Sequence, residues 1–221
     1  MRYGFYGIIV LLFAFCTLHG QEYRAGVSLN YHLFPKLVVE GESELRTHFK
    51  TEPYFNTTFS AHFRYSFFDP LYLGIFYSYS IRSDVLTTKD YNDEIDDKYK
   101  FGFDIAYKST RFNNDLRFNN RLRYQYTICE NKSKQYIKNK LTLDYKITNK
   151  MNPYIAIEPY YSILYNEVNV IRFYIGNEMP LFISKLEFYY IAEIHFREEY
   201  FYKKYKSTQY IVGVSYKLKL K

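Results

Sequence analysis

Long stretches of strict two-residue alternation constrain this chain more than any other feature of its sequence. From Phe55 to Phe67 every odd position is apolar, aromatic or Thr, and every even position is Asn, Thr, Ser, His or Arg. The same alternation runs over 116–128, where the polar row includes Arg117, Arg121 and Arg123. Because a β-strand points successive side chains to opposite faces, each stretch predicts a strand with one apolar and one polar face.

This pattern recurs along the chain and predicts strands that are mostly 10–14 residues long. Their expected ranges are 23–33, 37–49, 55–67, 71–82, 98–109, 115–128, 136–147, 154–165, 169–178, 185–196 and 207–220. Strands of soluble proteins average about 5–6 residues, whereas a tilted strand needs ~9–11 residues to cross a bilayer. Short turns alternate with longer polar loops, notably 83–97 and 197–206, which is typical of outer-membrane barrels. The sequence therefore predicts an all-β fold, an antiparallel transmembrane β-barrel.

The strand count conflicts with the usual architecture of such barrels. Eleven segments show the pattern, but bacterial single-chain barrels have an even number of strands. The alternation of turns also places the start of 23–33 on the side of the long loops. Either 23–33 is not a full strand, which gives ten, or one segment contains two strands, which gives twelve. We therefore expect ten to twelve strands.

The first 20 residues have the pattern of an export signal. Arg2 precedes an apolar run from Ile8 to Cys16 that is too short to span a membrane, and the next charged residue is Glu22. We expect a cleaved signal peptide over 1–20 and a barrel domain over 21–221. The alternative is acylation of Cys16. Loss of Arg2 lowers the formal net charge from +7 to +6 and leaves one cysteine, so no internal disulfide can form.

Aromatic residues make up 22% of the chain, with 28 Tyr, 20 Phe and no Trp. Several lie in pairs near expected strand ends, where amphipathic rings form girdles at the headgroup level of a membrane. The alternative is aromatic cross-strand pairing in a soluble sandwich. The pairs are Tyr65 and Phe67, Tyr77 and Tyr79, Tyr124 and Tyr126, Tyr160 and Tyr161, and Tyr189 and Tyr190.

Several short motifs occur in order from about Tyr23 to Leu220. They are Glu42-Ser43-Glu44-Leu45-Arg46, Arg121-Leu122-Arg123-Tyr124-Gln125, Pro153-Tyr154 with Glu158, Arg172 followed by Gly176, and Val212-Gly213-Val214-Ser215-Tyr216. With these motifs the chain resembles the domain of unknown function 2490 family, predicted outer-membrane barrel proteins of Gram-negative bacteria. Asn139-Lys140 departs from the Arg-Tyr-like pair expected there. The resemblance implies a barrel in the outer membrane and implies no chemistry.

The polar rows of the expected strands carry charges of both signs. In a barrel they would point into a narrow lumen, where unpaired charges are costly. We therefore expect acid–base ladders, such as Arg121 and Arg123 against Glu158 or Glu44, with a selective narrow pore or a small-ligand site as the alternative. The expected lumen charge network is Glu42, Glu44, Arg46, Arg121, Arg123, Glu158, Arg172, Glu187, Glu193 and His195.

Catalysis is a competing interpretation, because some outer-membrane barrels modify lipids with a Ser/His/acid group. The candidates are His195 with Glu193, in which His195 would be the base, and His62 with Ser60. The spacing of two residues puts each pair on one strand face, but such pairs arise by chance in alternating chains. The sequence therefore favours a protein without enzymatic activity, and we expect no catalytic residues, no metal and no cofactor.

Two loops suggest partners. Loop 83–97 is acidic but lacks the glycine spacing of a calcium loop, so a solvated loop is favoured. Loop 197–206 mixes Lys and Arg with aromatic residues, which suits lipopolysaccharide phosphates. We expect contacts with outer-membrane lipid and lipopolysaccharide, barrel-assembly machinery during insertion and a small solute, but not nucleic acid.

Together these patterns predict a protein of the cell outer membrane that is structural or forms a narrow pore. The alternatives are a lipid-modifying outer-membrane enzyme and a soluble periplasmic β-sandwich that binds a ligand.

Overall fold

A computed structural model describes residues 21–48, 54–84, 96–110, 112, 115–129, 132–148, 150–196 and 207–220. The predicted signal peptide, nearly all of loop 83–97 and loop 197–206 lie outside the described residues. Within these ranges no helix has the length and apolar character needed to cross a membrane.

The described part of the chain folds into eleven strands, all in one sheet. Most contain 12 to 15 residues, and the shortest, β8, contains 11. The alternating pattern explains this length, because it continues through most of each segment, with register shifts in β1, β3 and the β8–β9 pair. The strands are β1 (Glu22–Phe34), β2 (Leu37–His48), β3 (Tyr54–Phe68), β4 (Leu71–Asp84), β5 (Asp96–Lys108), β6 (Leu116–Cys129), β7 (Lys132–Tyr145), β8 (Asn152–Ser162), β9 (Glu167–Leu181), β10 (Ser184–His195) and β11 (Ser207–Leu220).

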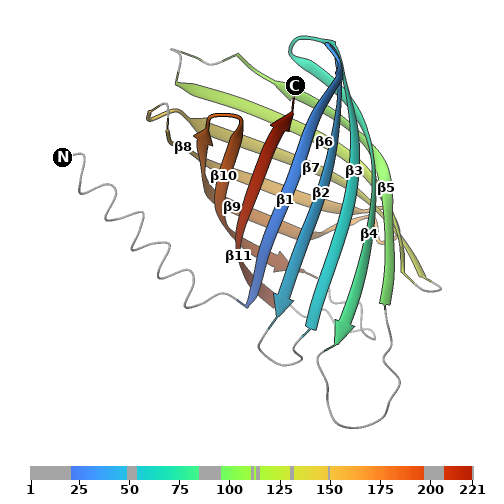
Figure 1. Cartoon of the computed structure of the whole chain (residues 1–221). Helices are drawn as coiled ribbons and strands as arrows, with labels where there is room; N and C mark the ends of the chain where they lie inside the picture. The colour runs from blue at the N-terminus through green and yellow to red at the C-terminus, as the bar shows by residue number, and fades with distance from the viewer. Residues whose placement is uncertain are drawn as a thin grey trace.

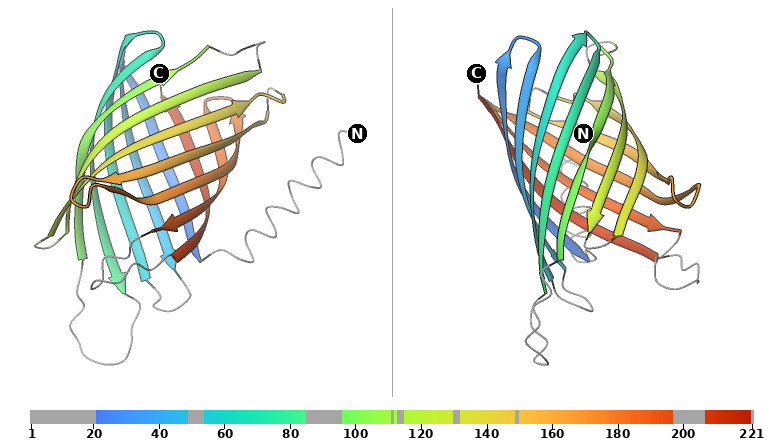
Figure 2. Two further views of the ribbon diagram at one scale, coloured as in Figure 1. Left: turned by 180° about the vertical axis from the view of Figure 1, so that it is seen from behind. Right: turned by 90° about the vertical axis from the view of Figure 1, so that its right-hand side faces the viewer.

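The sheet closes on itself into a barrel (Figures 1 and 2). Each strand pairs antiparallel with its sequence neighbour, whereas β1 and β11 pair in parallel, with Ala25 opposite Val214. An odd number of strands forces this parallel closure, because strands that alternate in direction leave the first and last pointing the same way. As a result, β11 ends at the barrel end opposite to the one where β1 begins (Figure 1).

Every predicted segment corresponds to one strand, so the all-β prediction is confirmed and the count lies inside the expected range. The two explanations offered for an even count are wrong for the described residues. β1 is a full strand of 13 residues, and no predicted segment divides into two. The parallel β1–β11 pair reconciles eleven strands with a closed sheet. The single closed sheet also excludes the two-sheet sandwich alternative.

Tight turns lie at one barrel end, where residues 35–36, 69–70 and 182–183 connect adjacent strands. The segments 49–53, 85–95 and 196–206 connect strands at the other end, where β1 also begins. The predicted asymmetry between short turns and long connections therefore holds only in part. The links 109–115 and 146–151 at the tight-turn end contain seven and six residues, whereas the β6–β7 and β8–β9 links at the other end contain two and four.

The two faces of the sheet differ sharply in chemistry. Outward side chains are mostly aliphatic or aromatic and strongly exposed, as at Ile75 and Ile175, each with an exposed fraction of 62%. As far as the structure describes the outward strand positions, they carry one acidic or basic side chain, Asp97 near the start of β5. This distribution of side chains is the reverse of that in a water-soluble protein, in which charged residues cover the surface and the core is apolar.

Two tyrosines assigned to the aromatic girdles from the sequence do not lie there. Tyr160 and Tyr189 are buried and line the lumen, whereas their neighbours Tyr161 and Tyr190 lie on the other face. The prediction was wrong because adjacent residues of a strand point to opposite faces, so a Tyr-Tyr pair cannot belong to one girdle.

Glycines make room for large rings inside the lumen. The ring of Tyr154 lies over Gly176 on the neighbouring strand, and the ring of Tyr189 lies over Gly213. A Cβ atom at Gly176 would lie 2.5 Å from Cζ of Tyr154. These rings join Ile211, which has no exposed surface, in an apolar cluster along β8–β11. The lumen is therefore partly filled by aromatic side chains.

Candidate functional site

The inward rows of all eleven described strands surround a hollow, charged lumen. It contains two cavities of about 470 Å³ and about 620 Å³, and both are lined by Glu40, Arg64, Arg121, Lys140 and Lys217. The two cavities share these lining residues, and the second extends to the short-turn end of the barrel, where Lys36 and Asp69 line it.

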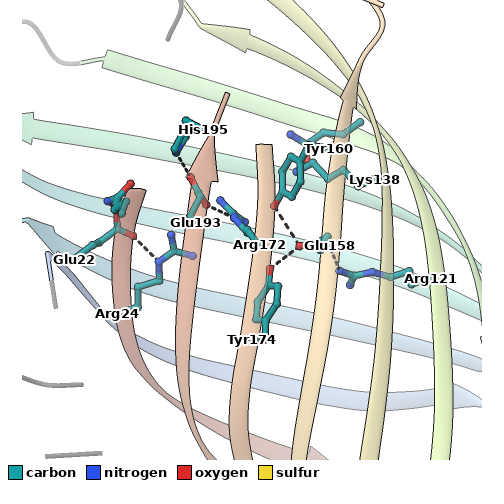
Figure 3. A network of polar contacts seen from close by, with 12 residues as sticks. Glu22, Arg24, Arg121, Lys138, Glu158, Tyr160, Arg172, Tyr174, Glu193 and His195 are labelled. Atoms are coloured by element: carbon teal, nitrogen blue, oxygen red, sulfur yellow. Dashed lines mark hydrogen bonds and ion pairs between the residues drawn. The ribbon is translucent and has the colours of Figure 1, made fainter. Parts of the chain in front are cut away.

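Glu158 on β8 is the centre of one polar network (Figure 3). Its Oε1 atom accepts a hydrogen bond of 3.3 Å from Nη2 of Arg121. Its Oε2 atom accepts hydrogen bonds from the hydroxyls of Tyr174, at 2.5 Å, and Tyr160, at 3.3 Å. Nζ of Lys138 lies 4.0 Å from the centre of the Tyr160 ring. This buried carboxylate thus joins side chains from β6, β8 and β9, and its bond to Arg121 reaches across the intervening β7.

Glu193 on β10 is the centre of a second network. It accepts hydrogen bonds from Arg172 and lies 2.6 Å from Nε2 of His195 (Figure 3). Arg172 and Glu193 face each other in the register of β9 and β10, so the strand pairing itself brings them together. Nearby, Arg24 donates a hydrogen bond of 2.5 Å to Glu22 from the same inward row of β1.

Further ion pairs join residues of neighbouring strands or residues two positions apart in one strand. Arg123 binds both carboxylate oxygens of Asp104, at 2.5 and 2.7 Å, and its guanidinium lies 4.0 Å from the centre of the Phe76 ring. Arg46 donates a hydrogen bond of 2.5 Å to Glu44.

All ten residues expected in the lumen network lie on inward rows, but not all with the expected partners. Arg121 contacts Glu158, one of the proposed pairs. Arg123 contacts Asp104 on the adjacent strand, and neither Glu158 nor Glu44. Glu187 contacts Lys217 at 2.5 Å and the Tyr154 hydroxyl at 2.5 Å. Glu42 has no hydrogen bond or ion pair among the described residues.

The sequence reasoning missed Asp104, Lys217 and the lumen tyrosines. The tyrosines were overlooked because tyrosine suits a membrane girdle as well as a polar lumen. Parity along the strand could have identified them, since Tyr160 shares its row with Glu158 and Tyr189 shares its row with Glu187 and Glu193.

The catalytic candidates lack a nucleophile in the described part of the chain. His195 contacts Glu193, which Arg172 also binds, and no described hydroxyl or thiol bonds to His195. His62 stacks on Phe76 at 5.7 Å between ring centres and makes no hydrogen bond with Ser60. The described residues contain no group of three or more His, Cys, Asp or Glu side chains placed to hold a metal ion.

Comparison with known proteins adds no relative to these observations. No protein-family model matches the chain, and no curated protein matches it in sequence.

The Glu158 network predicts that replacing this carboxylate with an uncharged side chain strongly destabilises the barrel. Glu158→Gln should lower the free energy of unfolding by about 2–3 kcal/mol, because it leaves Arg121 and the nearby lysines without their counter-charge. The measurement is the urea concentration that unfolds half of the reconstituted barrel, followed by circular dichroism.

Glu178→Gln is the matched control. Glu178 pairs with Lys185 at 2.7 Å, but both side chains are partly exposed toward the short-turn end. This change should cost at most about 1 kcal/mol. Equal losses in the two variants would contradict the central role of Glu158.

Proposed function

We propose that this chain is an outer-membrane β-barrel whose charged lumen is a narrow passage for small solutes. The observation that carries the proposal is the inverted distribution of side chains, with an apolar outer face around the whole barrel and ion pairs inside. A water-exposed surface of this kind would far exceed the apolar patches of soluble monomers, which rarely exceed a few hundred Å². Hydrocarbon is the environment in which it is stable.

The length of the strands supports the same setting. A tilted strand needs ~9–11 residues to cross a bilayer, and strands of 11 to 15 residues meet this requirement. The closed sheet of the described strands also leaves no unpaired edge in lipid. The export signal expected over 1–20 and the resemblance to the domain of unknown function 2490 family belong to this proposal as independent sequence arguments.

The lumen suits a restricted passage better than an open channel. Its two cavities hold about 470 and 620 Å³, and ion pairs and tyrosine rings occupy the space between the walls. Rings of charged side chains determine which solutes enter such passages. We therefore expect small, polar solutes and a low conductance.

Membrane insertion is tested by expression in a Gram-negative host. The mature chain should fractionate with the outer membrane, resist extraction by carbonate and migrate faster on gels before boiling than after it. A chain recovered in the periplasm as a water-soluble monomer without detergent would contradict the proposal.

The passage is tested by single-channel recording in planar bilayers. Tyr174 lines the lumen, so Tyr174→Ala should widen the passage and raise the conductance above that of the wild-type barrel. Tyr77→Ala removes the same ring from the outer face, where Tyr77 is half exposed, and should leave the conductance unchanged. If inserted wild-type and Tyr174→Ala barrels both carry no current, the passage is refuted while membrane insertion stands.

A further inference from the structure

One wall of the lumen holds lysines without a carboxylate of their own. Lys98 and Lys100 on β5 and Lys138 on β7 point inward, and none forms an ion pair with a carboxylate among the described residues. The carboxylates that act on Lys138 and Lys100 are already bound by arginines, Glu158 by Arg121 and Glu44 by Arg46. The lysine cluster, defined as Lys98, Lys100 and Lys138, is therefore a surplus of positive charge.

Cations predominate around Lys100, and the carboxylate that also acts on it, Glu44, is bound by Arg46. The charged groups that act on it most strongly are Arg46, Lys98, Lys138 and Arg172, which come from β2, β5, β7 and β9. Within the described residues Lys100 makes no hydrogen bond or ring contact. Four repelling cations against one carboxylate that Arg46 already binds are costly in a confined lumen.

The ammonium group of Lys138 uses only some of its hydrogen-bond donors. It donates one hydrogen bond of 2.8 Å to Oε1 of Gln125 and lies over the Tyr160 ring (Figure 3). Because an ammonium carries three N–H donors, further donors remain for a bound group. Lys138 and Lys100 line the same cavity of about 470 Å³, together with Gln125 and the hydroxyls of Thr58 and Ser78.

We propose that Lys100 and Lys138 of the lysine cluster bind a phosphate-type oxyanion in this cavity. Such a group supplies the missing negative charge and accepts several charge-assisted hydrogen bonds at once. Ionisable residues inside a membrane mark ion or substrate pathways when the protein leaves them unpaired, and rings of Lys and Arg line pores for anions and phosphates.

An acidic row on β2 favours one position for the anion. Glu40, Glu42 and Glu44 follow one another along the inward row of β2, and Glu42 has no hydrogen bond or ion pair among the described residues. A phosphate is repelled from this acidic row and attracted to the lysine cluster. The solute that carries it is therefore held on the wall formed by β5, β6 and β7.

Inorganic phosphate is the probe for this site, which deepens the proposed passage by naming its solute class. The folded barrel in a neutral detergent is titrated with phosphate and followed by calorimetry at low ionic strength. Lys100→Gln and Lys138→Gln should each weaken binding by about tenfold or more, the loss expected for one charged hydrogen bond. Lys100→Arg keeps the charge and should retain most of the affinity.

Lys219→Gln is the matched control, because it removes the same charge from the other barrel end, where Lys219 lines the second cavity. It should leave the affinity for phosphate unchanged. Failure of the folded wild-type barrel to bind phosphate, or an equal loss in the control, would overturn the proposed site. Either result leaves membrane insertion untouched, since that is measured by fractionation.

The same titration separates two sources of the phosphate group. Anionic phospholipid added to the detergent should not displace inorganic phosphate if the site serves soluble anions in the lumen. Displacement that disappears in Lys100→Gln would assign the site to a lipid headgroup.

Folding is checked for each variant by its fast migration before boiling. Lys100→Gln should also unfold at higher temperature than the wild-type barrel in the absence of phosphate, because it relieves repulsion among cations.

Discussion

The parallel pairing of β1 with β11 is the interaction on which the rest of the structure depends. It closes the sheet and so gives every strand an enclosed side and an outer side. Once the sheet is closed, the two-residue alternation assigns each side chain to the lumen or to the surroundings. The apolar outer face, the charged lumen and the absence of a free sheet edge in the described strands all follow from this closure.

The lumen achieves its charge balance by local means. Several carboxylates are bound by arginines from the same row or the adjacent strand, as in Arg46 with Glu44 and Arg172 with Glu193, whereas Arg121 reaches Glu158 across β7. Tyrosine hydroxyls supply further hydrogen bonds to Glu158 and Glu187, and their rings fill space over glycines. Lysines on β5 and β7 remain outside these pairs, so the same arrangement that stabilises the barrel leaves a positively charged wall.

Local patterns made most of the fold predictable, because alternation over more than ten residues has few explanations. The parallel form of the closure was not predicted, since the β1–β11 pair joins residues almost 200 positions apart and no local pattern encodes it. The ion-pair partners in the lumen were predicted only in part, because they depend on the register between strands. Arg123 could face several carboxylates, and only the register of β5 against β6 selects Asp104. Tyr160 and Tyr189 were misplaced because composition was given more weight than parity.

The central claim is that odd positions of β4 contact hydrocarbon while even positions face water in the lumen. Single cysteines introduced at 73–82 in a Cys129→Ser background can each carry a spin label in the lipid-reconstituted barrel. We expect collision rates with oxygen to peak at the odd positions and rates with a water-soluble nickel chelate to peak at the even ones, with a period of two. Uniform accessibility to the nickel chelate at both sets of positions would contradict the account.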